Sequence, residues 1–228
     1  MKERTEELLL TRDVTISAMG TLAESRDPET GRHIRRTQNY VRILAEGLRD
    51  QPQFAECLDD EMIDMLFKSA PLHDIGKVGV ADAILLKPGK LTEEEFAAMK
   101  KNVTLGRDAI LVAEQQLGGD SFLRIVREIA ETHQEKWDGS GYPHGLKGEE
   151  IPLSGRLMAV ADVYDALISK RVYKSAYPHS RAVKIIAEGR GTHFDPAIVD
   201  VFFECSEQFR RTALQFADCD EERDCLGR

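Results

Sequence analysis

The chain has 228 residues, of which 42% are hydrophobic and 31% charged, a composition typical of a globular domain with a buried core. Its net charge of −9 excludes general attraction to DNA, so an anionic ligand must be bound by a local cluster of basic side chains. No apolar run is long enough to span a bilayer, no signal-peptide pattern opens the chain, and the four cysteines lack C-x-x-C spacing. We therefore expect a cytoplasmic protein with reduced thiols and no membrane partner.

Residues 1–26 are expected to form a separate N-terminal segment, helical from about residue 4. Leu9, Ile16 and Ala23 recur every seven residues with charged residues between them. This pattern fits two interpretations: a first helix packed on the core, or a connector from an upstream regulatory domain whose seam would support a dimer. The sequence alone does not separate the two.

The remaining periodic segments also read as helices, and none shows the alternation of a β-strand. A capping-box spacing at Thr92 to Glu95 opens one of them. A glycine-rich stretch over 134–152 predicts a long loop, which the chain's only tryptophan should hold against the core. The expected helices cover 31–49, 59–70, a short run after Thr92, 105–117, 120–133, 153–168, 180–189 and 196–216. The predicted fold class is therefore all-α.

Several of these helices deliver metal-binding residue types in apolar surroundings. His33 lies on the inner face of the 31–49 helix, the pair His73-Asp74 follows the 59–70 helix, and His133 ends the 120–133 helix. Taken singly, an inward histidine is usually a hydrogen-bonded core residue, and a His-Asp pair is weak support for a site. The most apolar helix, 153–168, nevertheless carries Asp162 and Asp165, and a buried carboxylate is costly unless it is paired or bound to metal. Helical bundles build metal sites from such inward side chains, so together the set predicts a divalent metal.

The chain resembles the HD-GYP subgroup of the HD superfamily of metal-dependent phosphohydrolases over about residues 11–216. The motifs that carry the resemblance are Glu29 to His33, His73-Asp74-Ile75-Gly76-Lys77, the loop from His133 to Pro143, Ala161 to Leu167, and Arg171 to Lys174. The resemblance implies an HD-type helical bundle with a long N-terminal helix and a catalytic-type domain over 27–218. We expect 219–228 to form an acidic, disordered tail.

The resemblance also implies a role for each matching residue. His33, His73, Asp74 and Asp162 match the core metal ligands, with Asp74 bridging two metals. His133 matches a ligand of the second metal, and Glu29 matches an acidic ligand of a third. Lys77 matches a phosphate-contacting lysine that takes part in catalysis with Asp74. Arg171 and Lys174 match contacts to a dinucleotide, in a pocket shaped by Gly141, Tyr142 and Pro143; without the resemblance they would read as two solvated surface charges.

The sequence departs from the subgroup pattern at two positions. Asn102 and Gln134 stand where ligating histidines are expected. Their amide oxygens are neutral, weaker ligands, and they are better suited to a site for Mg, Mn or Ca than to an imidazole-rich iron site. The first metal site is therefore expected to be intact, while the second and third are depleted. Iron, manganese and magnesium all remain candidates for the metal.

The implied reaction is metal-assisted hydrolysis of cyclic di-GMP to linear pGpG, with GMP as a further product. The first N-terminal helix resembles the connector that follows a receiver domain in response regulators. One alternative is a degenerate module that binds cyclic di-GMP or pGpG with little or no turnover. A phosphohydrolase acting on another nucleotide is a second alternative, which the Gly141-Tyr142-Pro143 loop disfavours. The buried acids disfavour a purely structural domain.

Overall fold

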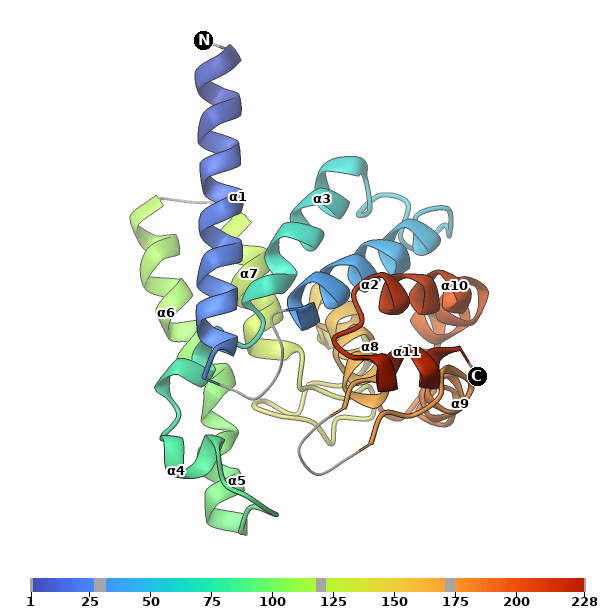
Figure 1. Ribbon diagram of the computed structural model, residues 1–228. Coiled ribbons are helices and arrows are strands. Elements are labelled where there is room, and N and C mark those ends of the chain that lie inside the picture. Colours follow the sequence, from blue (N-terminus) through green and yellow to red (C-terminus); the bar gives the residue numbers. More distant parts are fainter. Residues whose placement is uncertain (1, 27–31, 118–121, 171–174, 228) are drawn as a thin grey trace.

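A computed structural model describes residues 2–26, 32–117, 122–170 and 175–227. Within these ranges the chain forms helices joined by turns and loops, and it contains no β-strand, which confirms the all-α prediction (Figure 1). The α-helices are α1 (Lys2–Glu24), α2 (Arg32–Leu48), α3 (Asp60–Ser69), α4 (Asp82–Leu85), α5 (Glu93–Met99), α6 (Lys101–Leu117), α7 (Phe122–Thr132), α8 (Leu153–Ile168), α9 (His179–Glu188), α10 (Pro196–Gln215) and α11 (Asp220–Leu226). Short 3-10 turns are η1 (Ala70–Leu72), η2 (Ile75–Gly79) and η3 (Gly148–Glu150).

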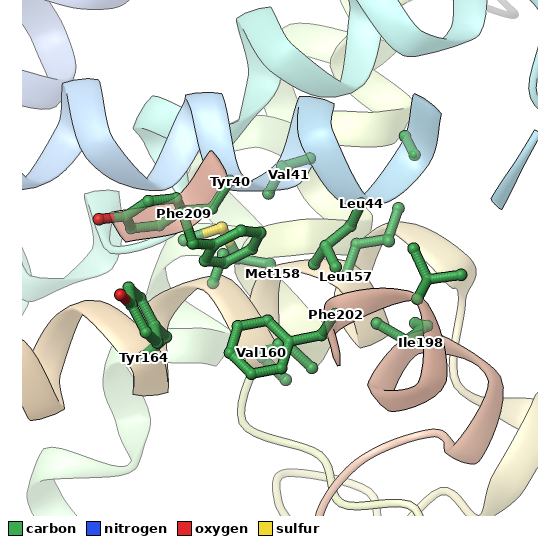
Figure 2. Packing of buried hydrophobic residues seen from close by; sticks show 14 of the residues in the cluster. Tyr40, Val41, Leu44, Leu157, Met158, Val160, Tyr164, Ile198, Phe202 and Phe209 are labelled. Atoms are coloured by element: carbon green, nitrogen blue, oxygen red, sulfur yellow. The ribbon is translucent and has the colours of Figure 1, made fainter. Parts of the chain in front are cut away.

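The core lies where α2, α8 and α10 pack together (Figure 2). Tyr40 of α2 stacks on Phe209 of α10 with ring centroids 4.4 Å apart. Tyr164 of α8 meets the same phenylalanine edge-on at 5.1 Å. Each fully buried aromatic or aliphatic side chain of this kind stabilises the fold by roughly 1.5–3 kcal/mol. The packed core thereby fixes the position of α8, which carries two of the predicted acids.

Two glycines allow the helices around the site to approach closely. A Cβ atom on Gly76 of η2 would lie 1.8 Å from the carbonyl oxygen of Asn102, inside α6. A Cβ atom on Gly155 of α8 would lie 2.1 Å from the Thr132 side chain at the end of α7. Only glycine fits at such distances. The segments bearing Asp74, Asn102, His133 and Asp162 are therefore drawn toward one another.

Helix α1 projects from the body at its N-terminal half and packs on η1 and η2 at its C-terminal half (Figure 1). Ile16 and Ala23 of the seven-residue repeat are buried, whereas Leu9 is 44% exposed. Leu10, Val14 and Leu22 lie on the exposed side. Of the two interpretations of this helix, packing on the core accounts for its C-terminal half. Among the described helices, none is long and apolar enough to cross a bilayer.

The prediction of a disordered tail over 219–228 is wrong for most of this segment. Residues Asp220–Leu226 form α11, and Leu226 is 1% exposed. The carboxylate of Glu222 accepts hydrogen bonds from the backbone N–H of Asp218 at 2.9 Å and of Lys170 at 2.9 Å. An acidic composition indicated a solvated tail, but this buried carboxylate anchors the segment to the end of α8.

Candidate metal centre

The His73-Asp74 pair follows directly from the end of α3. Asp59 caps this helix by accepting a hydrogen bond from the backbone N–H of Met62 at 2.7 Å. Pro71 then sits in the first turn of η1, where its missing N–H is tolerated. The backbone turns at Asp74 and enters η2. This local geometry directs the side chains of His73 and Asp74 into the protein, where they are 1% and 7% exposed.

Three buried histidines bond through Nδ1 and so direct their Nε2 atoms toward the same region of the interior. Nδ1 of His33 donates to Oδ2 of Asp165 at 2.7 Å, Nδ1 of His73 to the carbonyl of Ala70 at 3.0 Å, and Nδ1 of His133 to the carbonyl of Ile129 at 2.9 Å. A carbonyl or carboxylate oxygen only accepts, so each Nδ1 carries a proton. In the neutral rings, Nε2 is therefore the atom with a lone pair, as a metal ligand requires.

The Nε2 atom of His33 is surrounded by further ligand atoms. It lies 3.3 Å from Nε2 of His73, 3.6 Å from Oε1 of Glu24 and 3.8 Å from Oδ1 of Asp162. Ligand atoms of Glu24, His33 and His73 all lie within 4.8 Å of one another. Two imidazole lone pairs at 3.3 Å repel each other unless a proton or a metal ion lies between them. Burial lowers the pKa of His73, but the charge of Asp74 outweighs this and raises it.

Asp74 lies between the cluster around His33 and His73 and a second ligand candidate, His133. Its Oδ2 atom is 3.3 Å from Nε2 of His73, and its Oδ1 atom is 3.6 Å from Nε2 of His133. Nζ of Lys77, one turn later, lies 2.8 Å from Oδ2. Burial opposes ionisation of Asp74, but the charges of Lys77 and His73 outweigh it and hold the pKa of Asp74 well below its usual range. The Asp74 carboxylate thus faces His73 with one oxygen and His133 with the other, as a bridging ligand must.

The residues present fit a divalent metal. Nε2 of His133 is buried and has no hydrogen-bond partner among the described residues, which is costly unless another ligand satisfies it. Glu24 is 3% exposed and His33 is 2% exposed, so several anionic and imidazole groups share a site from which water is largely excluded. Mixed imidazole and carboxylate donors suit Mn, Fe and Zn.

Asn102 reaches the centre but is oriented as a hydrogen-bond donor. Its Nδ2 atom donates to Oδ1 of Asp74 at 3.2 Å, while its Oδ1 atom accepts from the backbone N–H of Val103 at 2.8 Å. The amide oxygen, the only atom able to bind a metal, is thereby engaged in α6. Gln134 contacts the loop through its backbone, whose carbonyl accepts from the N–H of Tyr142 at 3.2 Å.

The predicted pocket loop lies beside the centre. Gly141 sits so close to the backbone of Glu135 and Lys136 that a Cβ atom there would lie 2.3 Å from the Lys136 nitrogen. The buried carboxylate of Glu135 accepts from the N–H of His144 at 2.7 Å and shapes the turn after Pro143. Burial and the charges of Asp74 and Asp162 raise the pKa of Tyr142 to about 12, so its phenol remains a donor at neutral pH.

The structure brings together most of the predicted site. His33, His73, Asp74, Asp162, His133, Asn102 and Lys77 converge as described above. Glu29, Arg171 and Lys174 lie outside the described residues.

Sequence reasoning missed Glu24 and the partner role of Asp165. A signal for the first was available: Glu24 follows Ile16 and Gly20 at spacings of four, which places it on the buried face of α1. Asp165 was recognised as a buried acid on α8, but its partner His33 is 132 positions away in sequence and could not be assigned from spacing.

Residues 18–198 match the HD domain family. Over 212 residues the chain is 58% identical to a cyclic di-GMP phosphodiesterase of Vibrio cholerae serotype O1, a match covering 93% of this chain and 43% of that protein. It is 39% identical to 3'3'-cGAMP-specific phosphodiesterase 2 of the same organism, covering 84% and 34% of the two chains. It is 37% identical to the cyclic di-GMP phosphodiesterase response regulator RpfG of Xanthomonas campestris pv. campestris, covering 89% and 50%.

The fold has a solved counterpart. A crystal structure of a cyclic GMP-AMP specific phosphodiesterase of V. cholerae superposes with a TM-score of 0.59 at 20% identity, covering 94% of this chain and 53% of that one. The chain thus spans between about a third and a half of the length of the three sequence relatives. The match over 18–198, the helical fold and the relatives agree with the resemblance found in the sequence: the chain belongs to the HD domain family.

Proposed function

We propose that the chain is the catalytic part of a metal-dependent phosphodiesterase that hydrolyses cyclic di-GMP to linear pGpG, with GMP as a further product. The observation that carries the proposal is that the Nε2 atoms of three histidines converge with the carboxylates of Glu24, Asp74 and Asp162. The 58% identity to a cyclic di-GMP phosphodiesterase supports the choice of substrate.

The first metal would be held by His33, His73, Asp74 and Asp162, with Glu24 within reach of the same point. Among the described side chains that are strong metal ligands, only Asp74 and His133 would hold the second metal, because Asn102 turns its N–H₂ group inward. Gln134 is proposed as a weak contributor to this depleted side, and Glu29 as a ligand of a third metal. Manganese or iron is preferred for the first position over magnesium, since imidazoles supply half of its core ligands.

A bound divalent metal supplies a water acidic enough to attack phosphorus near neutral pH and withdraws charge from the phosphate oxygens. The chain's own residues do the rest. Lys77, 2.8 Å from Asp74, is placed to exchange that carboxylate for a phosphate oxygen as the substrate enters. Tyr142 remains protonated and can donate to a phosphate or a guanine. Gly141 and Pro143 shape the loop that presents it, and Arg171 and Lys174 are proposed to bind the dinucleotide through charge-assisted hydrogen bonds.

One observation favours a second candidate function, a binding module with little turnover. The amide oxygen of Asn102 is occupied by the backbone of Val103, so the second metal side lacks a ligand there. A site with a single metal would bind the anionic dinucleotide and hydrolyse it slowly.

Restoring the two missing imidazoles separates the candidates. The parent and the Asn102→His, Gln134→His double variant are compared for Mn bound per chain and for pGpG formed from cyclic di-GMP, with 3'3'-cGAMP as competing substrate. We expect slow, Mn-stimulated hydrolysis by the parent, and more metal with a higher kcat in the double variant. Tight binding of cyclic di-GMP without turnover by either protein identifies the binding module, and faster cleavage of 3'3'-cGAMP overturns the substrate assignment.

A matched pair of histidine variants checks the site itself. His73→Ala removes a ring whose Nε2 faces both His33 and Asp74, and it should abolish Mn binding with little change in helical content. His144→Ala removes a ring that contacts Glu131 and is 43% exposed, and it should leave Mn binding unchanged. Equal Mn content in the two variants would rule out the proposed ligand set.

We also propose that α1 joins the domain to an upstream receiver domain and that its exposed face pairs two chains. The apolar residues Leu8, Leu10, Val14 and Leu22 are each at least 60% exposed and support this assignment. The cytoplasm is the proposed compartment, supported by the free state of all four cysteines. Sedimentation of the parent and a Val14→Glu, Leu22→Glu variant tests the dimer: a monomeric parent would contradict it.

A further inference from the structure

The ring of His33 is held from behind by an acid outside the ligand set. Oδ2 of Asp165 accepts from Nδ1 of His33 at 2.7 Å, on the side of the ring opposite Nε2. Asp165 is 1% exposed and lies one turn after Asp162 on α8. The same helix therefore carries one acid that faces Nε2 and another that faces Nδ1 of a single histidine.

Asp165 is itself held by a buried arginine from α2. Nε and Nη2 of Arg36 donate to Oδ1 and Oδ2 of Asp165 at 2.6 and 2.9 Å, a two-pronged pair that fixes the carboxylate plane. The hydroxyl of Ser169 donates to Oδ2 at 3.3 Å. Because His33 and Arg36 lie one turn apart on α2, the carboxylate joins both to α8 at one point.

The arginine extends this network to the C-terminal segment. Its Nη1 atom donates to the carbonyl of Phe216 at 2.8 Å and to Oδ2 of Asp218 at 2.8 Å. These residues connect α10 to α11. A continuous chain of hydrogen bonds therefore runs from the α10–α11 connection through Arg36 and Asp165 to His33.

We propose that Asp165 is a positioning residue of the metal centre: it fixes the Nδ1–H tautomer and the ring orientation of His33, so that Nε2 is presented to the metal. Arg36 and Asp218 hold Asp165 in place, which makes metal affinity depend on the α10–α11 connection. The inference rests on the proposed metal-dependent function. Partners of this kind, behind a ligating histidine, typically change metal affinity about 10–100-fold when removed.

A purely structural ion pair is the alternative, and the chain contains a matched example. Arg156 of α8 donates from Nη1 to Oδ2 of Asp195 at 2.6 Å, and both side chains are largely buried. Among the described residues, the Asp195 carboxylate pairs with Arg156 and the backbone N–H of Ala197 and with no histidine ring. Asp195→Asn therefore removes one buried arginine–carboxylate pair while leaving the metal centre untouched, and Asn can still cap α10.

The test measures Mn binding by calorimetry in a double-mutant cycle. Asp165→Asn should weaken Mn binding about 10–100-fold in the parent. In a His33→Gln background the same substitution should add little, because the residue through which Asp165 acts is already gone. Asp218→Asn should weaken Mn binding by a smaller factor, and Asp195→Asn should leave it unchanged.

Three results would overturn the inference: parent-like Mn affinity in Asp165→Asn, an equal further loss in both backgrounds, or an equal loss in Asp195→Asn. Nitrogen chemical shifts of the ¹⁵N-labelled, metal-free parent decide the matter even if Asp165→Asn fails to fold. His33, assigned by the resonance lost in His33→Gln, should be protonated on Nδ1, and protonation on Nε2 alone would refute the inference. A parent that binds no Mn at all refutes the proposed function instead, while the tautomer result still stands on its own.

Discussion

Asp74 illustrates how much a single side chain determines in this site. Its two oxygens face two different imidazoles, 3.3 Å from His73 and 3.6 Å from His133, and Lys77 lies against one of them. Asn102 donates to the other oxygen, where a histidine would present a lone pair. An amide in place of an imidazole is therefore a weaker metal ligand, and it also presents a hydrogen-bond donor to Asp74 where the imidazole would present a lone pair.

Phe96 should also contribute to substrate binding. Its ring is 47% exposed, lies edge-on to Tyr142 at 6.3 Å and has Nζ of Lys100 5.2 Å from its centroid. Stacking of a base on an aromatic side chain contributes about 1–3 kcal/mol. Phe96→Ala should therefore raise KM for cyclic di-GMP about 5–150-fold at unchanged Mn content. Steady-state kinetics check this, with Phe203→Ala, 41% exposed on α10, as the control. Equal KM values in the two variants would exclude the contact.

Helix α1 contributes to the candidate metal centre as well as to the N-terminal arm. Gly20 packs on the carbonyl of Pro71, and Glu24 lies near His33. Arg26, just after the helix, donates to the carbonyl oxygens of Lys77 and Val80 at 3.3 and 3.1 Å. The last turns of α1 thus hold the segment that bears His73 and Asp74. Any displacement of this helix would move a ligand candidate and the backbone of η2 together.

Gly20→Ala tests this packing, because two effects oppose each other. Alanine favours a helix over glycine by about 0.5–1 kcal/mol. The added Cβ atom would lie 2.6 Å from the carbonyl oxygen of Pro71, a contact with rigid backbone that costs about 1–3 kcal/mol. We expect the clash to prevail, so urea unfolding should show a less stable variant and calorimetry should show weaker Mn binding. A variant that is more stable than the parent and binds Mn normally would show that α1 is not held in this way.

The elements also show what can be predicted from sequence in this fold. The apolar run of α8 predicted its bounds and its burial, because a helix apolar on nearly every side has only the interior to occupy. The capping box at Thr92 was confirmed, since it depends on neighbouring residues alone. The spacing of Glu24 from Ile16 and Gly20 indicates that it is buried, but its partner His33 and the partners of Arg36 come from other segments and cannot be assigned from spacing. The ordered α11 was missed for the same reason.

The Arg36–Asp165 pair joins α2, α8 and the C-terminal segment, and so contributes to the stability of the whole molecule. Breaking a buried pair of this kind by removing one partner destabilises a protein by about 3–5 kcal/mol. Burial would raise the pKa of Asp165, but Arg36 and His33 outweigh it and hold the pKa below its ordinary value of 3.8. The stabilisation is therefore fully present above that value and is lost as the pH falls through the folded pKa.

This sign yields a pH prediction. At pH 7 the Asp165→Asn variant should unfold at a lower urea concentration than the parent. Below pH 4 the unfolded parent takes up a proton at Asp165 before the folded parent does, so the difference in free energy of unfolding between the two proteins should shrink. Urea titrations at several pH values, down to the lowest at which both unfold cooperatively, measure it. A difference that stays constant or widens as the pH falls would contradict the assigned pKa direction.

We propose that a divalent metal binds where His33, His73, Asp74 and Asp162 converge, and its position can be measured directly. Anomalous diffraction at the manganese edge, from crystals of the parent grown with Mn, locates the ion without reference to activity. We expect a strong peak within coordinating distance of Nε2 of His33 and His73 and of Oδ2 of Asp74. A weaker peak, or none, is expected between Oδ1 of Asp74 and His133, since Asn102 stands where an imidazole would complete that side. Saturating Mn with no peak beside His33 and His73, or with the strong peak on the His133 side, would contradict it.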